Sequence, residues 1–114
     1  MPYFKIETSQ KIKDADADKL SKDASSFLSG LLGKPEHVIM VSVCQGMRIL
    51  FNQTTAPAAY VVIKSIGLPA EKCPGYAEAV CDFLEDAIGV PADRIYIDFA
   101  DINGSMFGWN RQTF

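Results

Sequence analysis

Residues 32–43 read LGKPEHVIMVSV, and residues 88–99 read IGVPADRIYIDF. The two stretches superimpose when the sequence is shifted by 56 residues. Each contains a Gly-x-Pro triplet and then a run of β-branched and apolar residues that is typical of a strand. Glycine commonly ends a helix, and a proline shortly after it prevents the helix from continuing. The repeat therefore predicts the same helix-to-strand junction in both halves, residues 1–56 and 57–114.

A helical pattern precedes each Gly-x-Pro triplet. Apolar side chains recur there at spacings of three and four residues, as on one face of a helix. They are Ala17, Leu20, Ala24, Phe27, Leu28 and Leu31 in the first half and Tyr76, Val80, Phe83, Leu84, Ala87 and Ile88 in the second. We expect Asp14 or Asp16 to cap the first helix and Pro74 to lie in the first turn of the second. β-rich runs at 2–8 and 60–66 precede the helices.

The predicted fold class is α/β, a single domain over residues 1–114. Each half forms a βαβ unit, because a crossover helix places its two strands parallel and adjacent. Two units give a four-stranded sheet with two helices on one face. We expect apolar side chains on both faces, because the helices cannot cover eight of them. These are Phe4, Ile6, Val41, Val43, Val61, Ile63, Ile95 and Ile97. A second copy of the chain would cover the other face, in an obligate homo-oligomer.

The composition fits a soluble globular protein, with 48% hydrophobic and 22% charged residues. A formal net charge of −3 argues against nucleic acid or an acidic membrane surface as partner, since both require a basic patch. The three cysteines form no CxxC pair, so neither a disulfide framework nor a thiol redox site is predicted. No apolar run suggests a signal peptide or a membrane span. We expect a cytoplasmic protein with no metal or cofactor; export by a route without a signal peptide stays open.

Pro2 is the most informative single residue, because removal of Met1 would expose its secondary amine. An ordinary α-amino group has a pKa of about 8. Burial lowers this pKa by penalising the protonated form, and the amine can then act as a general base at neutral pH. Many chains begin with Met-Pro and have no such role. A retained Met1 would also turn the amine into an amide without basicity.

Short motifs run in order through the whole chain. They are Met1-Pro2, Gly33-Lys34-Pro35, Ser65-Ile66-Gly67, Asp93-Arg94 with Ile95-Tyr96-Ile97, Asp101-Ile102-Asn103, Gly108-Trp109-Asn110 and Thr113-Phe114. Together they resemble the macrophage migration inhibitory factor and phenylpyruvate tautomerase family. The resemblance implies a homotrimer around a central channel, with active sites at subunit interfaces. It also implies keto–enol tautomerisation of aromatic α-keto acids such as phenylpyruvate, with D-dopachrome as a laboratory substrate and Pro2 as the catalytic base.

The resemblance assigns three binding residues near Pro2. Lys34 matches the lysine that holds the substrate carboxylate. Its structural alternative is a cation that stabilises a helix C-terminus. Ser65 and Ile66 match positions beside the proline, where the backbone amide of Ile66 donates to the carboxylate. In the bare sequence, these two residues are simply the end of a strand.

Four further residues complete the expected site. Tyr96 matches a tyrosine contributed by the neighbouring chain, although core packing is the alternative. Trp109 and Phe114 would line the slot for the aromatic ring, or would pack against a neighbouring subunit. Asp98 departs from the vertebrate members, which have asparagine there. Its carboxylate would repel an anionic substrate and raise the pKa of the amine, so weak-to-moderate activity is expected.

Two other functions stay open at this stage. The chain could bind a receptor or partner like a cytokine, with a vestigial or ligand-binding proline pocket. A related dehalogenase or hydratase activity that uses the same amine ranks last, because the extra arginines that such substrates often require are missing. The CxxC motif of the vertebrate members is also absent, so thiol oxidoreductase activity is not expected.

Overall fold

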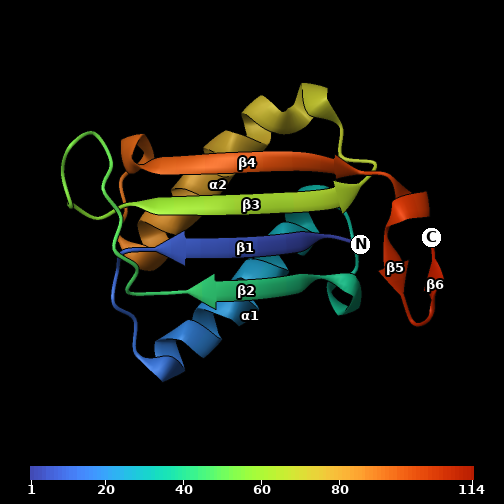
Figure 1. Cartoon of the computed structure of the whole chain (residues 1–114), viewed down its shortest axis with the longest axis horizontal. Coiled ribbons are helices and arrows are strands. Elements are labelled where there is room, and N and C mark those ends of the chain that lie inside the picture. Colours follow the sequence, from blue (N-terminus) through green and yellow to red (C-terminus); the bar gives the residue numbers. More distant parts are fainter.

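Both halves of the repeat form the expected strand–helix–strand unit (Figure 1). The computed structural model describes all residues from Met1 to Phe114. The first unit contains β1 (Tyr3–Thr8), α1 (Asp14–Leu32) and β2 (Met40–Cys44). The second contains β3 (Ala59–Ile66), α2 (Cys73–Ile88) and β4 (Ile95–Ile102). A short hairpin of β5 (Gly108–Trp109) and β6 (Gln112–Thr113) follows.

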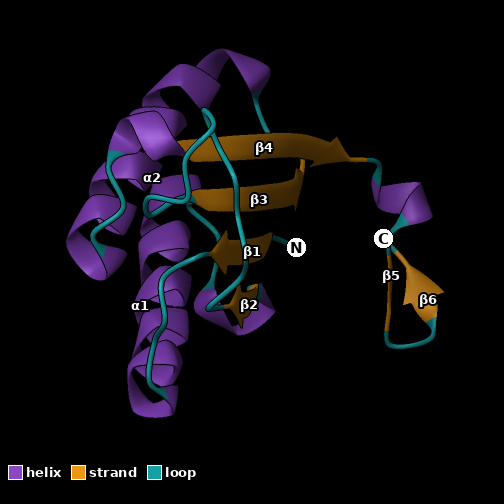
Figure 2. Ribbon diagram, turned by 60° about the vertical axis from the view of Figure 1, so that its left-hand side comes forward, coloured by secondary structure: helices purple, strands orange, loops and turns teal.

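The four long strands form one sheet in the order β2-β1-β3-β4. Within each unit the two strands are parallel, as the crossover helices require. The units meet through an antiparallel pairing of β1 with β3. Both helices lie on one side of this sheet, which confirms the predicted α/β architecture (Figure 2).

The helix ends largely follow the sequence signals. Gly33 and Gly89 adopt left-handed φ angles of 66° and 68°, and their amides donate to carbonyls of the preceding turn. Pro74 lies in the first turn of α2, as expected. The predicted cap of α1 is wrong. Lys13 occupies the N-cap position without a side-chain cap hydrogen bond, and Asp14 is already the first helical residue. The acidic side chains in this first turn instead stabilise the helix through a favourable interaction with its dipole.

The hydrophobic core lies between the helices and one sheet face. The expectation that apolar strand residues point to both faces is wrong. Phe4 pairs with Val41 and with Ile63, and paired residues share a face. Each strand contributed two residues at i and i+2, which a period of two places on the same side. All eight therefore point toward the helices and belong to the core or pack against it.

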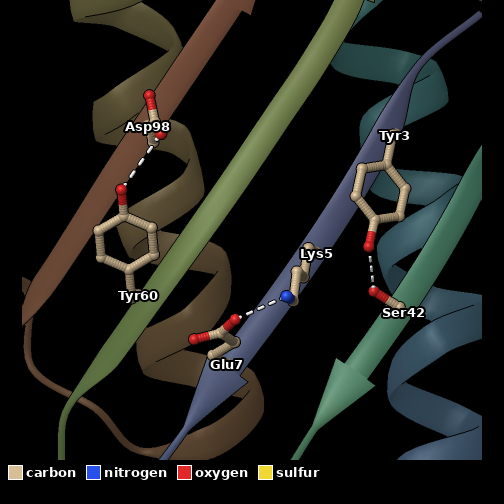
Figure 3. A network of polar contacts seen from close by, with 6 residues as sticks. All are labelled: Tyr3, Lys5, Glu7, Ser42, Tyr60 and Asp98. Atoms are coloured by element: carbon tan, nitrogen blue, oxygen red, sulfur yellow. Dashed lines mark hydrogen bonds and ion pairs between the residues drawn. The ribbon is translucent and has the colours of Figure 1, made fainter.

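The open face of the sheet has a mixed character. Three polar contacts lie on it (Figure 3). They are Tyr3 Oη to Ser42 Oγ at 2.7 Å, Lys5 Nζ to Glu7 Oε1 at 2.8 Å, and the Tyr60 hydroxyl donating to Asp98 Oδ2 at 3.1 Å. Glu7 raises the pKa of the half-buried Lys5 ammonium by accepting its hydrogen bond. The open face is therefore not the apolar surface from which the oligomer was expected, and it does not support that argument.

The C-terminal hairpin supplies a different argument for assembly. It stands away from the sheet, beyond the end of β4 (Figure 2). Its turn residues Asn110 and Arg111 have positive φ angles, as a tight two-residue hairpin requires. Trp109 is 59% exposed and Met106 is 83% exposed. An isolated two-stranded hairpin is marginal in water, so this segment favours a partner surface. No helix combines the length and the apolar character needed to cross a bilayer.

Candidate functional site at the start of the first strand

Pro2 is buried directly before β1, the strand that lies between β2 and β3 in the sheet. Its carbonyl accepts the amide of Met40 at 3.1 Å. Tyr3 pairs with Met40 on one side and with Lys64 on the other. One residue earlier in the same register, Pro2 comes level with Ser65. The predicted base therefore lies in a desolvated position flanked by two strands.

Lys34 reaches the N-terminal amine from the loop after α1. The backbone of Lys34 is held at both ends by Ser29: its amide donates to the Ser29 carbonyl at 3.2 Å, and the Ser29 hydroxyl donates to its carbonyl at 2.6 Å. Burial lowers the pKa of the Met1 amine, and repulsion from the Lys34 ammonium lowers it further. The Lys34 ammonium is thus close enough to the N-terminus to act on the Met1 amine; its role in binding a substrate carboxylate stays a prediction.

Strand β3 ends at Ser65 and Ile66, at the same end of the sheet as Pro2. Ser65 is buried, and its hydroxyl lies 3.5 Å from the Ile66 carbonyl. The chain then turns at Gly67, whose φ of 74° is left-handed. Asp101 Oδ1 accepts the amides of Gly67 and Leu68 at 2.9 and 3.1 Å and so fixes this turn. Sequence reasoning placed Asp101 in a motif but assigned it no role.

Phe114 lies close to this group, because Gly104 packs against both Phe114 and Ile66. A Cβ added to Gly104 would lie 3.5 Å from Phe114 Cβ and 3.7 Å from the Ile66 side chain. The Phe114 amide donates to the Gly104 and Phe107 carbonyls, both at 3.2 Å. Trp109 stacks on Phe114, with ring centroids 6.4 Å apart and planes inclined by 6°. The two C-terminal aromatics thus form one exposed stack at the Pro2 end of the sheet, where both termini lie (Figure 1).

Tyr96 and Asp98 lie elsewhere on the sheet. In register, Tyr96 is level with Tyr60 and Glu7, five residues along β1 from Pro2. At the rise per residue of a strand, Tyr96 is displaced from Pro2 by about 16 Å along the strand direction, and Asp98 by about 10 Å. The two strand spacings between β1 and β4 add to both separations. One chain therefore brings together Pro2, Lys34, Ser65 and Ile66 but keeps Tyr96 and Asp98 apart from them.

Asp98 has a local partner that the sequence did not predict. The Tyr60 hydroxyl points across β3 and β4 to this carboxylate (Figure 3). Because the carboxylate accepts that hydrogen bond, it raises the pKa of the Tyr60 phenol. The alternating pattern of β3 carried the available signal, since it places Tyr60 on the same face as Asp98.

One hollow of about 630 Å³ lies on the C-terminal hairpin and is lined by residues 108–113, Trp109 among them. A groove of about 550 Å³ runs between the start of α1 and the end of α2, at the other end of the sheet. Its lining mixes lysines with aspartates, including Lys11, Lys19, Asp23 and Asp86. No group of three or more His, Cys, Asp or Glu side chains is arranged to hold a metal ion.

Comparison with known proteins matches the whole chain, residues 1–114, to the family model of macrophage migration inhibitory factor (MIF). The chain belongs to the MIF family. It is 36% identical to a MIF homologue of Trichuris trichiura, with all of both chains covered. It is 32% identical to the MIF of Xenopus tropicalis, which covers all of this chain and 99% of the relative.

Solved MIF structures share the fold. The MIF homologue of Prochlorococcus marinus has a TM-score of 0.91 at 42% identity, with 98% of each chain covered. The MIF of Trichinella spiralis has a TM-score of 0.89 at 29% identity, over 98% of this chain and 99% of that chain. MIF membership confirms the resemblance seen in the sequence. It also supports an isomerase-type activity in general terms.

Proposed function

We propose that this MIF-family chain is a keto–enol tautomerase of aromatic α-keto acids of the phenylpyruvate type, in which the Pro2 amine is the general acid and base. The observation that carries the proposal is the buried start of β1 with Lys34 beside the N-terminal amine. Burial and the Lys34 ammonium both lower the pKa of the Met1 amine, and we expect the same two influences to act on the Pro2 amine once Met1 is removed. More of it is then unprotonated at neutral pH, as a general base requires.

The reaction needs one proton to move between carbon and oxygen. The neutral amine removes a proton from the carbon next to the carbonyl, and the electron pair of that C–H bond shifts to give an enolate. The protonated amine then returns the proton to the oxygen, which yields the enol. Lys34 holds the substrate carboxylate together with Ser65 and the backbone amide of Ile66. Trp109 and Phe114 line the slot for the aromatic ring.

We further propose that the chain functions as a homotrimer. Tyr96 and Asp98 are too far from Pro2 in one chain to contact the same small substrate, so a neighbouring subunit must supply them. The exposed hairpin with Trp109 and Phe114 offers the apolar surface for this contact. Each active site would then lie at a subunit interface, which accounts for the split of the site residues into two groups.

The proposal is tested by the decay of enol-phenylpyruvate absorbance with the wild-type chain and with Pro2→Gly. Glycine keeps a terminal amine but loses the ring that fixes its direction. We expect kcat/KM to fall about 10²-fold, the cost of misplacing a reacting group by about 1 Å. Equal rates for the two chains would refute the assignment of Pro2.

Replacing Asp98 by asparagine should raise turnover. The change removes a negative charge that repels the substrate carboxylate and stabilises the protonated amine. Repulsion between two solvated unit charges is worth about 1 kcal/mol, so we expect kcat/KM to rise about fivefold. Titration of the phenols should also show a lower pKa for Tyr60, which loses its carboxylate acceptor. Asp82→Asn on the exposed side of α2 is the charge-matched control; unchanged or reduced turnover in Asp98→Asn would count against the proposed repulsion.

A partner-binding role is the second candidate, because several relatives carry the MIF name and the C-terminal segment exposes apolar side chains. In that case the proline pocket binds a ligand or is vestigial. The same assay discriminates between the two functions. A chain that lacks Met1 and still gives no turnover above buffer would favour binding, which a pull-down from cells of a host would then examine.

A further inference from the structure

Arg94 is a buried cation with an unusual set of partners. It lies two residues before Tyr96 and is only 8% exposed. All four of its hydrogen bonds go to backbone carbonyls, and no carboxylate neutralises it. The acceptors belong to one loop between β2 and β3, at Phe51, Thr54, Ala56 and Pro57, at distances of 2.6, 3.2, 2.9 and 3.2 Å.

The loop held by Arg94 contains a tight turn. Phe51 and Thr54 exchange two backbone hydrogen bonds of 3.1 Å each. The turn residues Asn52 and Gln53 have φ angles of 51° and 61°, which non-glycine residues rarely adopt. The guanidinium binds the carbonyls of both residues that close this turn. A strained turn persists only when its surroundings hold it, and Arg94 provides that hold.

The turn places the Phe51 ring in contact with both Arg94 and Tyr96. The guanidinium carbon lies 5.1 Å from the centre of the Phe51 ring, within the range of a cation–π contact. The Phe51 ring also contacts the Tyr96 ring, with centroids 4.8 Å apart and planes inclined by 36°. Tyr96 is otherwise 60% exposed on the open face of the sheet. Phe51 is thus the aromatic support that limits the rotation of an exposed phenol.

We propose that Arg94 and Phe51 are positioning residues for Tyr96. Arg94 fixes the loop, the loop fixes the Phe51 ring, and that ring fixes the direction in which Tyr96 meets a substrate bound at the Pro2 of a neighbouring subunit. This inference rests on the proposed tautomerase function. Because Tyr96 contacts substrate and transfers no proton, losing its support weakens binding in the ground and transition states alike. KM then rises while kcat is retained.

The test is Phe51→Leu, which keeps an apolar side chain in a half-buried position but removes the ring. We expect KM for enol-phenylpyruvate to rise about threefold to tenfold, the range for the loss of one aromatic pair. In a Tyr96→Leu background the same change should have no further effect. The matched control is Phe83→Leu, because Phe83 stacks on Phe27 at 4.5 Å in the helix layer, far from Tyr96. An unchanged KM, or an equal rise in the Tyr96→Leu background, would overturn the proposal.

A second measurement separates this inference from the proposed function. In NMR spectra of the chain with labelled tyrosine, Phe51→Leu should shift the Tyr96 ring signals, which lose the ring current of Phe51, while Tyr3 and Tyr76 stay unchanged. Arg94→Lys keeps the charge but not the forked donors, so it should shift the same signals. If these shifts occur and Pro2-dependent turnover is absent, the support is real and the tautomerase assignment fails. If Tyr96 does not respond, the positioning role is refuted whatever the activity.

Discussion

A chain that retains Met1 should lose the entire contribution of the base, so kcat/KM for enol-phenylpyruvate should fall by about 10²- to 10⁴-fold. The peptide bond between Met1 and Pro2 ties up the proline nitrogen as a planar amide with no available lone pair. The effect should exceed that of Pro2→Gly, which keeps a terminal amine in a poorer position. Retained Met1 is thus the sharper test of the amine itself.

The experiment compares one preparation before and after treatment with methionine aminopeptidase. Intact mass gives the fraction of chains that begin at Pro2, and turnover should rise in proportion to that fraction. The active chain should also show a rate that increases with pH through an amine pKa below the ordinary α-amino value. Pro2 is buried, and the Lys34 ammonium that lowers the pKa of the Met1 amine should also disfavour protonation of the freed Pro2 amine. Turnover that is independent of Met1 removal would exclude the Pro2 amine as the base.

Replacing Leu28 by alanine should destabilise the fold by about 2–5 kcal/mol. Leu28 is fully buried on α1 and belongs to the core cluster between the helices and the sheet. The change removes three methyl or methine groups and leaves a cavity that close-packed neighbours fill only in part. Because α1 leads directly into the Lys34 loop, loss of this packing should loosen the candidate site as well as the core.

Denaturant unfolding at a fixed protein concentration measures this effect, since the stability of an oligomer depends on concentration. Ser26→Ala is the control, because Ser26 is exposed on the same helix and surface changes stay within about 0.5 kcal/mol. A loss below about 1 kcal/mol in Leu28→Ala would contradict the core described above.

The repeat with its Gly-x-Pro junctions was sufficient to predict both βαβ units, the helix ends at Gly33 and Gly89, and helices on one face. These features depend on local backbone preferences and on periodicity, which a sequence displays directly. The cap of α1 could not be assigned in the same way. Asp14 is a good capping residue by type, but the helix begins with it instead of after it.

The candidate site was predictable only in part. Pro2, Lys34, Ser65 and Ile66 come from three distant segments, and family motifs pointed to each of them. The roles of Arg94, Phe51 and Tyr60 were not visible in the sequence. A buried guanidinium, a supporting ring and a phenol–carboxylate pair depend on contacts between residues 37 to 45 positions apart.

The sequence by itself determined the order of the elements, the α/β class and the family to which the chain belongs. Strand register was decided only by the tertiary structure. Register turned all eight apolar strand residues toward the helices, left an open face of mixed character, and placed Pro2 level with Ser65 but far from Tyr96. Burial of one sheet face against the helices selects this register, through packing between segments that are remote in the chain. No local pattern around Pro2 or Tyr96 could therefore reveal that one subunit holds only part of the proposed site.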